Sequence, residues 1–311
     1  QGVTYVATDS LGVPLDTTAV ITVKNSHFLS KIVANSKSPV ILRGPAQSFV
    51  QFNHPVLGIR EQVGIKTPNN FFIAISGAGR IYQQIAETDS LLYFKRIDDN
   101  ENINYNLGAF YFSIGETIYN QGGYGFWKTN GTIRGFNFKD GEWDVFTTNI
   151  EVYNPIFPGS SWFDHYKNAL YIPYQQLINS GLKGFQNAAG KIVDGVMYLD
   201  CKTWDWVKAG KVRSSYLEIL KNARTKVYNQ SGYFISDGED VYWFNFLNNS
   251  VSINTNRTLA QSINRLDNSS IQYYRDGILY SYFPETGALD TLVVDESKFV
   301  KEPEAMWGLP L

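Results

Sequence analysis

Few residues of this chain have the types and spacing that catalysis requires. Glu116, Asp164 and Asp194 are candidates for the carboxylate pair of a glycoside hydrolase, whose two carboxyl groups stand about 5–9 Å apart. Nothing around them separates these acids from others in the chain. No phosphate-binding glycine loop, zinc-binding helix motif or nucleophile elbow occurs in a usable context. The sequence predicts no catalytic residue, and enzyme activity stays open.

Metal-binding residues are equally sparse. The three histidines, His27, His54 and His165, are far apart in the sequence, and Cys201 is the single cysteine. Residues 98–102 form the one dense acidic run, which offers oxygen ligands for Ca²⁺ but lacks the glycine of an EF-hand loop. Such a run is also typical of a solvated turn. We predict no cofactor, with calcium at this run as the alternative.

Aromatic residues in the expected loops are the better functional candidates. Tyr and Trp beside Asn and Gln give large contact areas at a low entropy cost, which is typical of binding sites. Two long segments, 124–132 and 175–192, are expected to project from the fold, where binding residues are often found. The alternative is that these rings pack in the interior. The predicted partner-binding residues are Tyr124, Phe126, Trp127, Trp162, Tyr166 and Tyr174.

The elements that must position these residues are strands. Alternating apolar and polar residues recur between Gly, Asn and Asp turns, which predicts short antiparallel strands. Helices are expected only at 214–226 and, as one turn after an Asp cap, at 295–300. The predicted strands span 71–75, 91–96, 109–114, 133–138, 143–147, 169–174, 196–200, 233–236, 241–246, 271–274 and 278–283.

Several of these strands group into similar units. Residues 109–147 read as four strands in meander order, and weaker units follow at 162–207, 232–253 and 271–294, with another upstream at 71–97. Repeats of about 40–50 residues are typical of propeller blades. In the clearest unit a strand ends in Gly122-Gly123, Phe136 follows 13 residues after Gly123, and Trp143 follows seven residues later.

This unit resembles the kelch repeat, in which a Gly-Gly pair, an aromatic residue and a tryptophan stand at similar spacings. The second unit keeps only the aromatic residue and Trp204 of this pattern. The others keep only the strand–turn–strand order. The resemblance implies an all-β propeller of about six four-stranded blades, with five to seven allowed. It also implies that Gly122 and Gly123 allow a close approach, that Trp143 and Trp204 pack between blades, and that a strand near 19–23 or 39–42 completes the last blade.

Two enzyme classes built on similar propellers fit poorly. A copper radical oxidase would need a Tyr–Cys cross-link and two histidines around the metal, whereas the three histidines here lie in different units. A sialidase-type enzyme would need three converging arginines, for which Arg80, Arg96 and Arg134 are the candidates. Exposed loop arginines are the simpler interpretation of these three.

Composition restricts the remaining classes. Aromatic residues make up 15% and charged residues 18%, with a net charge of −2. The high aromatic share favours strands. The net charge gives no sign of the basic surface that nucleic-acid binding requires. The sequence contains no apolar stretch of about 18 residues and therefore predicts no membrane span. The start at Gln1 and short motifs such as Asp9-Ser10-Leu11, similar to glycosylation sites of Gram-negative envelope proteins, favour the periplasm or cell surface.

Together these features predict a non-catalytic binding or scaffold module outside the cytoplasm. We expect an N-terminal arm at 1–35, a propeller at 36–295 and a C-terminal tail at 296–311. One face of the ring would dock a protein partner or a glycan as part of an envelope complex. The alternatives are a carbohydrate-active enzyme with its site at the channel mouth, and a structural subunit of a phage or envelope assembly.

Overall fold

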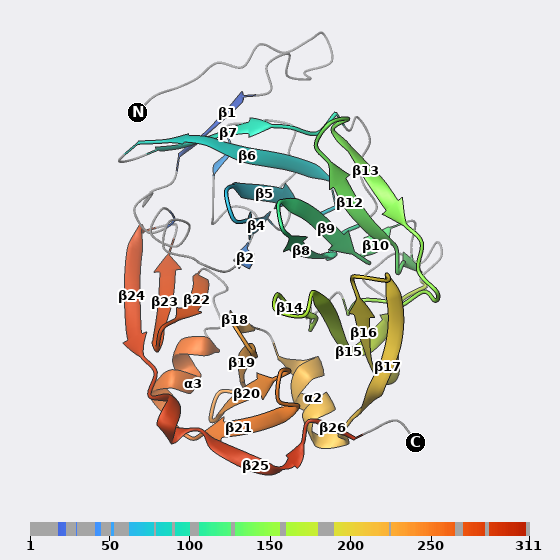
Figure 1. Ribbon diagram of the computed structural model, residues 1–311. Helices are drawn as coiled ribbons and strands as arrows, with labels where there is room; N and C mark the ends of the chain where they lie inside the picture. Colours follow the sequence, from blue (N-terminus) through green and yellow to red (C-terminus); the bar gives the residue numbers. More distant parts are fainter. Residues whose placement is uncertain are drawn as a thin grey trace.

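Five small antiparallel sheets stand around a common axis (Figure 1). The chain is a five-bladed β-propeller. The computed structural model describes residues 18–22, 29, 41–44, 51–52, 62–77, 79–88, 91–99, 106–125, 128–155, 160–179, 190–223, 225–264, 270–283 and 286–308. The expected fold class is therefore confirmed, with five blades, within the range that the sequence allowed.

Blade 1 contains the N-terminal strands as well as its own meander. Its sheet runs in the order β2 (Ile41–Gly44), β4 (Gln62–Lys66), β5 (Phe71–Ile75), β6 (Arg80–Glu87), β7 (Leu91–Arg96), β1 (Thr18–Thr22) and β3 (Gln51–Phe52). β1 pairs with β7, and β2 pairs with β4. The prediction that one of these strands completes the last blade is therefore wrong, because both hydrogen-bond within the first blade.

Blades 2 and 3 follow the meander predicted from the repeats. Blade 2 consists of β8 (Phe110–Ile114), β9 (Thr117–Gln121), β12 (Ile133–Asn137) and β13 (Glu142–Phe146). A separate hairpin, β10 (Tyr124–Gly125) and β11 (Lys128–Thr129), interrupts it between β9 and β12. Blade 3 consists of β14 (Trp162–Asp164), β15 (Ala169–Leu177), β16 (Lys191–Asp200) and β17 (Asp205–Val212).

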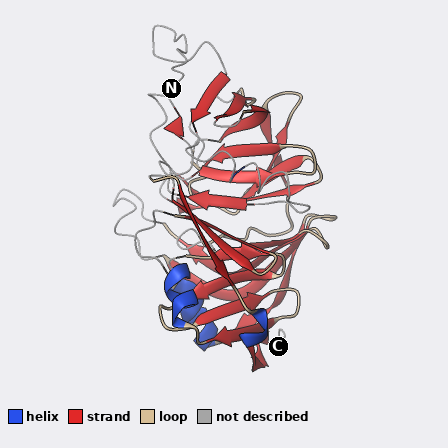
Figure 2. Ribbon diagram, turned by 90° about the vertical axis from the view of Figure 1, so that its left-hand side faces the viewer, coloured by secondary structure: helices blue, strands red, loops and turns tan. Residues whose placement is uncertain are grey.

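Blades 4 and 5 are each preceded by a short helix. α2 (Ser214–Asn222) leads into β18 (Val227–Asn229), β19 (Gly232–Ser236), β20 (Val241–Asn245) and β21 (Ser250–Asn254). α3 (Arg257–Ile263) then leads into β22 (Ile271–Arg275), β23 (Ile278–Phe283) and β24 (Ala288–Val293). Figure 2 shows both helices in the half of the molecule away from the N-terminus. The helix at α2 was predicted, whereas α3 was not.

The C-terminal segment runs back along the outer edges of earlier blades. After a single 3-10 turn at Glu296–Lys298, β25 (Val300–Ala305) pairs with β21 of blade 4. β26 (Trp307–Gly308) then pairs with β17 of blade 3. We call β25 and β26 the C-terminal belt. In Figure 1 the belt follows the rim from blade 5 past blade 4 to blade 3.

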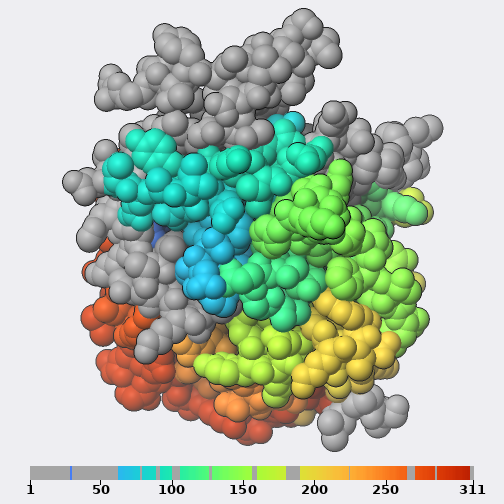
Figure 3. Space-filling view, turned by 45° about the horizontal axis from the view of Figure 1, so that its top comes forward, coloured from blue at the N-terminus to red at the C-terminus, as the bar shows by residue number. Residues whose placement is uncertain are grey.

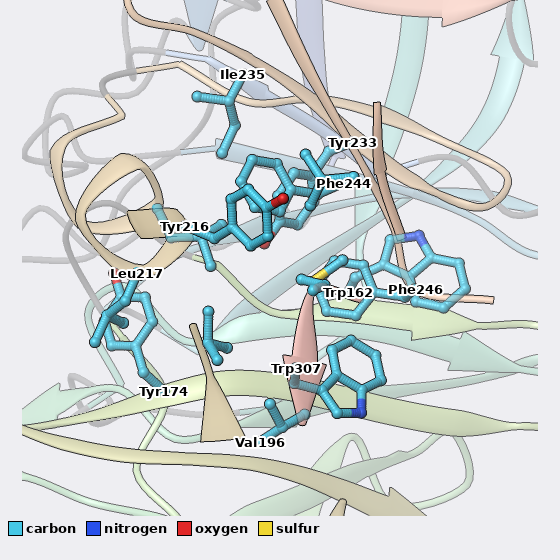
Figure 4. Packing of buried hydrophobic residues seen from close by; sticks show 14 of the residues in the cluster. Trp162, Tyr174, Val196, Tyr216, Leu217, Tyr233, Ile235, Phe244, Phe246 and Trp307 are labelled. Carbon is cyan, nitrogen blue, oxygen red and sulfur yellow. The ribbon is translucent and has the colours of Figure 1, made fainter. Parts of the chain in front are cut away.

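The hydrophobic core is divided into clusters that lie between neighbouring blades. Phe72, Tyr111 and Phe136 join blades 1 and 2, whereas Phe112 and Phe163 stack between blades 2 and 3 with ring centroids 4.6 Å apart. The cluster between blades 3 and 4 also contains α2 and the belt (Figure 4). Because strands alternate their side chains between two faces, each blade supplies residues to both neighbours.

Candidate functional site

Connections on a meander blade alternate between the two faces of the ring, because adjacent strands are antiparallel. We call the face that carries the β9–β12 and β15–β16 connections the loop face. It holds both segments from which the sequence predicts partner binding, 124–132 and 175–192. Residues 126–127 and 180–189 of these segments lie outside the described residues.

Two glycines let the chain leave blade 2 on this face. Gly122 and Gly123 have φ angles of +71° and +113°. A Cβ at Gly123 would lie 2.7 Å from the backbone of Asn106, and one at Gly122 would lie 2.9 Å from Cβ of Asn154. A close approach is found at both glycines. The neighbour of Gly122 belongs to the connection between blades 2 and 3, whereas Gly123 contacts the segment that precedes β8.

The β10–β11 hairpin is held to blade 3 by hydrogen bonds between Thr129 and Ile178. Thr129 N donates to Ile178 O at 2.9 Å, and Ile178 N donates to Thr129 Oγ1 at 3.1 Å. Lys128 forms an antiparallel bridge with Asn179. On the other side Tyr124 N donates to Leu107 O at 2.9 Å. The two segments that the sequence proposed separately are thus parts of one continuous surface.

Polar side chains extend this surface over the join between blades 2 and 3. Glu151 accepts hydrogen bonds from Gly131 N and from the Tyr153 hydroxyl, both at 2.9 Å. Gln175 Oε1 accepts from Tyr153 N at 3.0 Å. Burial and the bond to Glu151 together raise the pKa of Tyr153. We call residues 124–125, 128–130, 151–153 and 175–179 the β10–β11 surface.

A buried hydrogen-bond chain supports the surface from below. Gly108 N donates to Ser76 Oγ at 2.8 Å, Asn154 Nδ2 donates to Gly108 O at 3.1 Å, and Ser161 Oγ donates to Asn154 Oδ1 at 2.5 Å. The chain runs from blade 1 through blade 2 to blade 3. Networks of this kind fix one arrangement of the groups above them, because a buried polar group without a partner is costly.

The predicted partner-binding aromatics are found in different environments. Tyr124 is half-buried on the β10–β11 surface, and Phe126 and Trp127 lie outside the described residues. Tyr166 is 74% exposed on the turn after β14, which is on the opposite face from the hairpin.

Trp162 and Tyr174 are buried between blades 3 and 4, at 3% and 1% exposure. Trp162 stacks on Phe246, and Tyr174 accepts a hydrogen bond from Ser160 Oγ. Both side chains are drawn among the packed residues in Figure 4. Their environment is the interior packing that the sequence left as the alternative, since a buried ring cannot contact a partner unless the core opens.

Trp143 and Trp204 lie between blades. Trp143 of blade 2 donates through Nε1 to Gly79 O of blade 1 at 2.8 Å. Trp204 of blade 3 lies against Phe146 and Tyr119 of blade 2, with ring centroids 4.4 and 5.1 Å away. Each tryptophan therefore contacts the preceding blade.

The three acids considered for glycoside cleavage have separate structural contacts. Glu116 accepts from Thr67 Oγ1 and from Asn69 and Asn70 at the join of blades 1 and 2. Burial alone would raise the pKa of Glu116, but these hydrogen bonds lower it. Asp164 accepts from the backbone N–H groups of the turn that follows it, and Asp194 pairs with Lys211 at 2.9 Å. Each acid is engaged by a different part of the fold.

The metal-binding candidates can be placed only in part. Asp98 is buried and pairs with Arg96 at 2.7 Å, and residues 100–102 of the same run lie outside the described residues. His27 and His54 also lie outside them. Within the part of the chain that the structure describes, no group of three His, Cys, Asp or Glu side chains is arranged to hold a metal. Burial raises the pKa of Cys201 to about 12, which keeps its thiol protonated and unreactive.

His165 makes stability depend on pH. Burial lowers its pKa from 6.5 to about 4, so below pH 6.5 the unfolded chain takes up a proton that the folded chain does not. The contribution is complete above pH 6.5 and is lost as the pH falls towards 4. We expect the wild type to lose about 2 kcal/mol more than His165→Gln between pH 7 and pH 5. Urea unfolding at both pH values measures this, and equal losses would contradict it.

Comparison with known proteins finds similarity only among solved structures. No protein-family model matches the chain, and a search of curated proteins finds no match. Among solved structures the chain is similar to that entitled "Structure of YjhT", with 10% sequence identity and a TM-score of 0.43 over 77% of this chain and 96% of that one. Among the helices described, none has the length and apolar character to cross a membrane.

Proposed function

We propose that this propeller is a non-catalytic binding or scaffold module that docks a protein partner on the β10–β11 surface. The observation that carries the proposal is the union of two blade insertions into one surface, through the Thr129–Ile178 hydrogen bonds and the Lys128–Asn179 bridge. Insertions on a rigid scaffold are where binding residues concentrate. Here the scaffold also holds the insertions together.

The chemistry of the surface favours a protein over a neutral small molecule. Tyr124 and Tyr153 offer amphipathic rings, and Asn130, Gln175 and Gln176 offer amide groups between them, all half-buried. Such a mixture is typical of protein-binding surfaces that contact a partner without a deep pocket. A glycan is the other ligand that this mixture would accept, and we treat it as an outcome of the test.

The kelch relationship and the location belong to the same proposal. The Gly122-Gly123 turn and the contacts of Trp143 and Trp204 with the preceding blade are what a kelch-like blade would need. The short Asp-Ser/Thr motifs support a place in the periplasm or on the surface of a Gram-negative cell. There the propeller would serve an envelope complex.

Affinity purification with paired variants tests the docking surface. We expect the Tyr124→Ser/Lys128→Glu double variant to recover at least tenfold less of the main co-purifying protein than the wild type. The loss follows from removing a ring and reversing a charge at the centre of the surface. The matched control is Tyr166→Ser/Lys167→Glu, which changes the same residue types on the opposite face.

Three results would contradict the proposal. Loss of the partner in the Tyr166/Lys167 variant alone would move docking to the opposite face. Recovery of a glycan without protein would replace the partner class. Cleavage of a glycan by the purified chain would make it an enzyme. Circular dichroism of both variants shows whether the fold is retained.

A further inference from the structure

Arg134 of β12 carries a guanidinium without an acidic partner. Its side chain is half-buried, and burial lowers its pKa. Within the described chain no carboxylate lies in ion-pairing distance of it, whereas Arg96, Arg213 and Arg275 pair with Asp98, Glu304 and Asp276. A partly desolvated charge is costly unless an opposite charge or hydrogen-bond acceptors compensate for it.

The hydrogen-bond partner of Arg134 is itself incompletely paired. Arg134 Nη1 makes one long hydrogen bond, 3.4 Å, to Asn120 Oδ1 on the neighbouring strand. Asn120 is fully buried, and its Nδ2 has no hydrogen-bond partner among the described residues. Two sets of donors, a guanidinium and an amide N–H₂, therefore lie side by side with too few acceptors.

The two residues lie on β9 and β12, the strands that flank the β10–β11 hairpin in the chain. Asn120 precedes the Gly122-Gly123 turn, and Arg134 follows the hairpin directly in β12, opposite Asn120 in the β9–β12 pairing. Both side chains point to the blade 1 side of blade 2, since Asn120 also pairs with Tyr111 of the cluster that joins these blades. Figure 3 shows blade 1 (cyan) and blade 2 (green) meeting along one side of the molecule.

We propose that Arg134 and Asn120 form a binding site for a carboxylate at the blade 1 edge of the β10–β11 surface. A planar carboxylate accepts two parallel hydrogen bonds from a guanidinium and neutralises its charge. Asn120 is fully buried, so it acts as a positioning residue whose Oδ1 accepts from Nη1 of the guanidinium.

The single positive charge favours a carboxylate over a phosphate. A phosphate carries nearly two negative charges at neutral pH, and half of that charge would stay uncompensated beside one arginine. The inference rests on the proposed function in one respect only: it names the chemistry that a docked partner would present at this edge of the surface. Binding of a free carboxylate at Arg134 is measured without the partner.

The test uses three probes with one sugar ring. Protein labelled with ¹⁵N-arginine is titrated with glucuronate, glucose or glucose 6-phosphate, and the Nε–H signal of Arg134 is followed, identified by its absence in Arg134→Gln. We expect glucuronate to shift this signal to saturation and glucose to leave it unchanged. By calorimetry, Arg134→Gln and Asn120→Leu should bind glucuronate at least tenfold more weakly. Arg257→Gln, at an exposed position of α3, is the matched control and should bind like the wild type.

Several results would overturn the site. These are a signal that does not saturate with glucuronate, an equal shift with glucose, or tighter binding of glucose 6-phosphate. Unchanged affinity of Arg134→Gln for glucuronate would also overturn the site. A separate measurement covers the unpaired charge: without ligand, Arg134→Met should raise the melting temperature, since it replaces a desolvated charge by an apolar chain of similar length. A lower melting temperature would mean that the guanidinium has a partner.

The experiments can reject either proposal and retain the other. Saturable glucuronate binding with no effect of Tyr124→Ser/Lys128→Glu on partner recovery would retain the carboxylate site and reject the docking surface. The opposite pattern would retain the surface and reject the site.

Discussion

Trp307→Ala is expected to lower the melting temperature by roughly 10 °C, since removal of a buried tryptophan typically costs about 3–5 kcal/mol. Trp307 is 7% exposed and packs among the buried residues of the cluster between blades 3 and 4 (Figure 4). Its ring centroid lies 5.9 Å from that of Phe246 and 6.3 Å from that of Tyr171. Its backbone is held by Asn249, whose Oδ1 accepts from Trp307 N and whose Nδ2 donates to Trp307 O. The side chain therefore fixes the C-terminal belt to blades 3 and 4 together.

The belt provides its own control. Val300 lies on β25 of the same belt but is 70% exposed, so Val300→Ala should leave the melting temperature within about 1 °C of the wild type. Differential scanning calorimetry of both variants makes the comparison. If Trp307→Ala melts like Val300→Ala, the belt does not contribute to the stability of the ring.

The second large effect is expected at the double glycine. Gly123→Val places a branched side chain at φ +113°, a region that L residues rarely adopt, and its Cβ within 2.7 Å of the Asn106 backbone. Backbone strain and the displacement of Asn106 together should cost at least about 3 kcal/mol. Thermal unfolding should show a melting temperature lower by roughly 6 °C or more.

Gly115 provides a control without the close contact. It also has a positive φ, +56°, in the left-handed region that L residues can adopt, and a Cβ there would meet nothing within 4 Å. Gly115→Ala therefore reports the cost of a left-handed residue without a contact, whereas Gly123→Ala adds the rarer φ angle and the contact with Asn106. Equal losses in these two alanine variants would remove the close approach as the reason for glycine at 123.

Most of the fold could be predicted from local patterns. The strands at 71–75, 91–96 and 278–283 match β5, β7 and β23, because alternation and flanking turns determine short antiparallel strands. The blade 2 meander followed from the spacing of its glycines and tryptophan. The turn predicted at 295–300 is the 3-10 turn Glu296–Lys298, with Asp295 as its cap.

What the sequence did not show was long-range pairing. Nothing in the residues of β1 and β2 indicates that they hydrogen-bond within blade 1 rather than complete the last blade, and nothing in β25 and β26 indicates that they return to blades 4 and 3. Pairing partners are chosen by the geometry of the whole ring. Local propensity contains no such information.

In the candidate site, too, local features could be predicted from the sequence and long-range contacts could not. Both insertions were found from their length and aromatic content, but their union through Thr129 and Ile178 depends on a contact between residues 49 positions apart. Trp162 and Tyr174 look like Tyr124 in sequence, and only their burial distinguishes packing from an accessible surface. Arg134 was considered as part of an arginine triad. Its lack of an acidic partner among the described residues could not be read from its neighbours in the chain.

The C-terminal belt also sets the order in which the protein can mature on the ribosome. Lys211 of blade 3 pairs with Gly308. The outer edge of that blade therefore stays unpaired until a strand almost a hundred residues later has been translated. Blades 3 and 4 therefore emerge with open strand edges and exposed apolar residues, the state most prone to aggregation. Both outer edges are completed only when β25 and β26 have been translated, so a nascent chain halted before β25 would leave β21 and β17 unpaired on their outer sides.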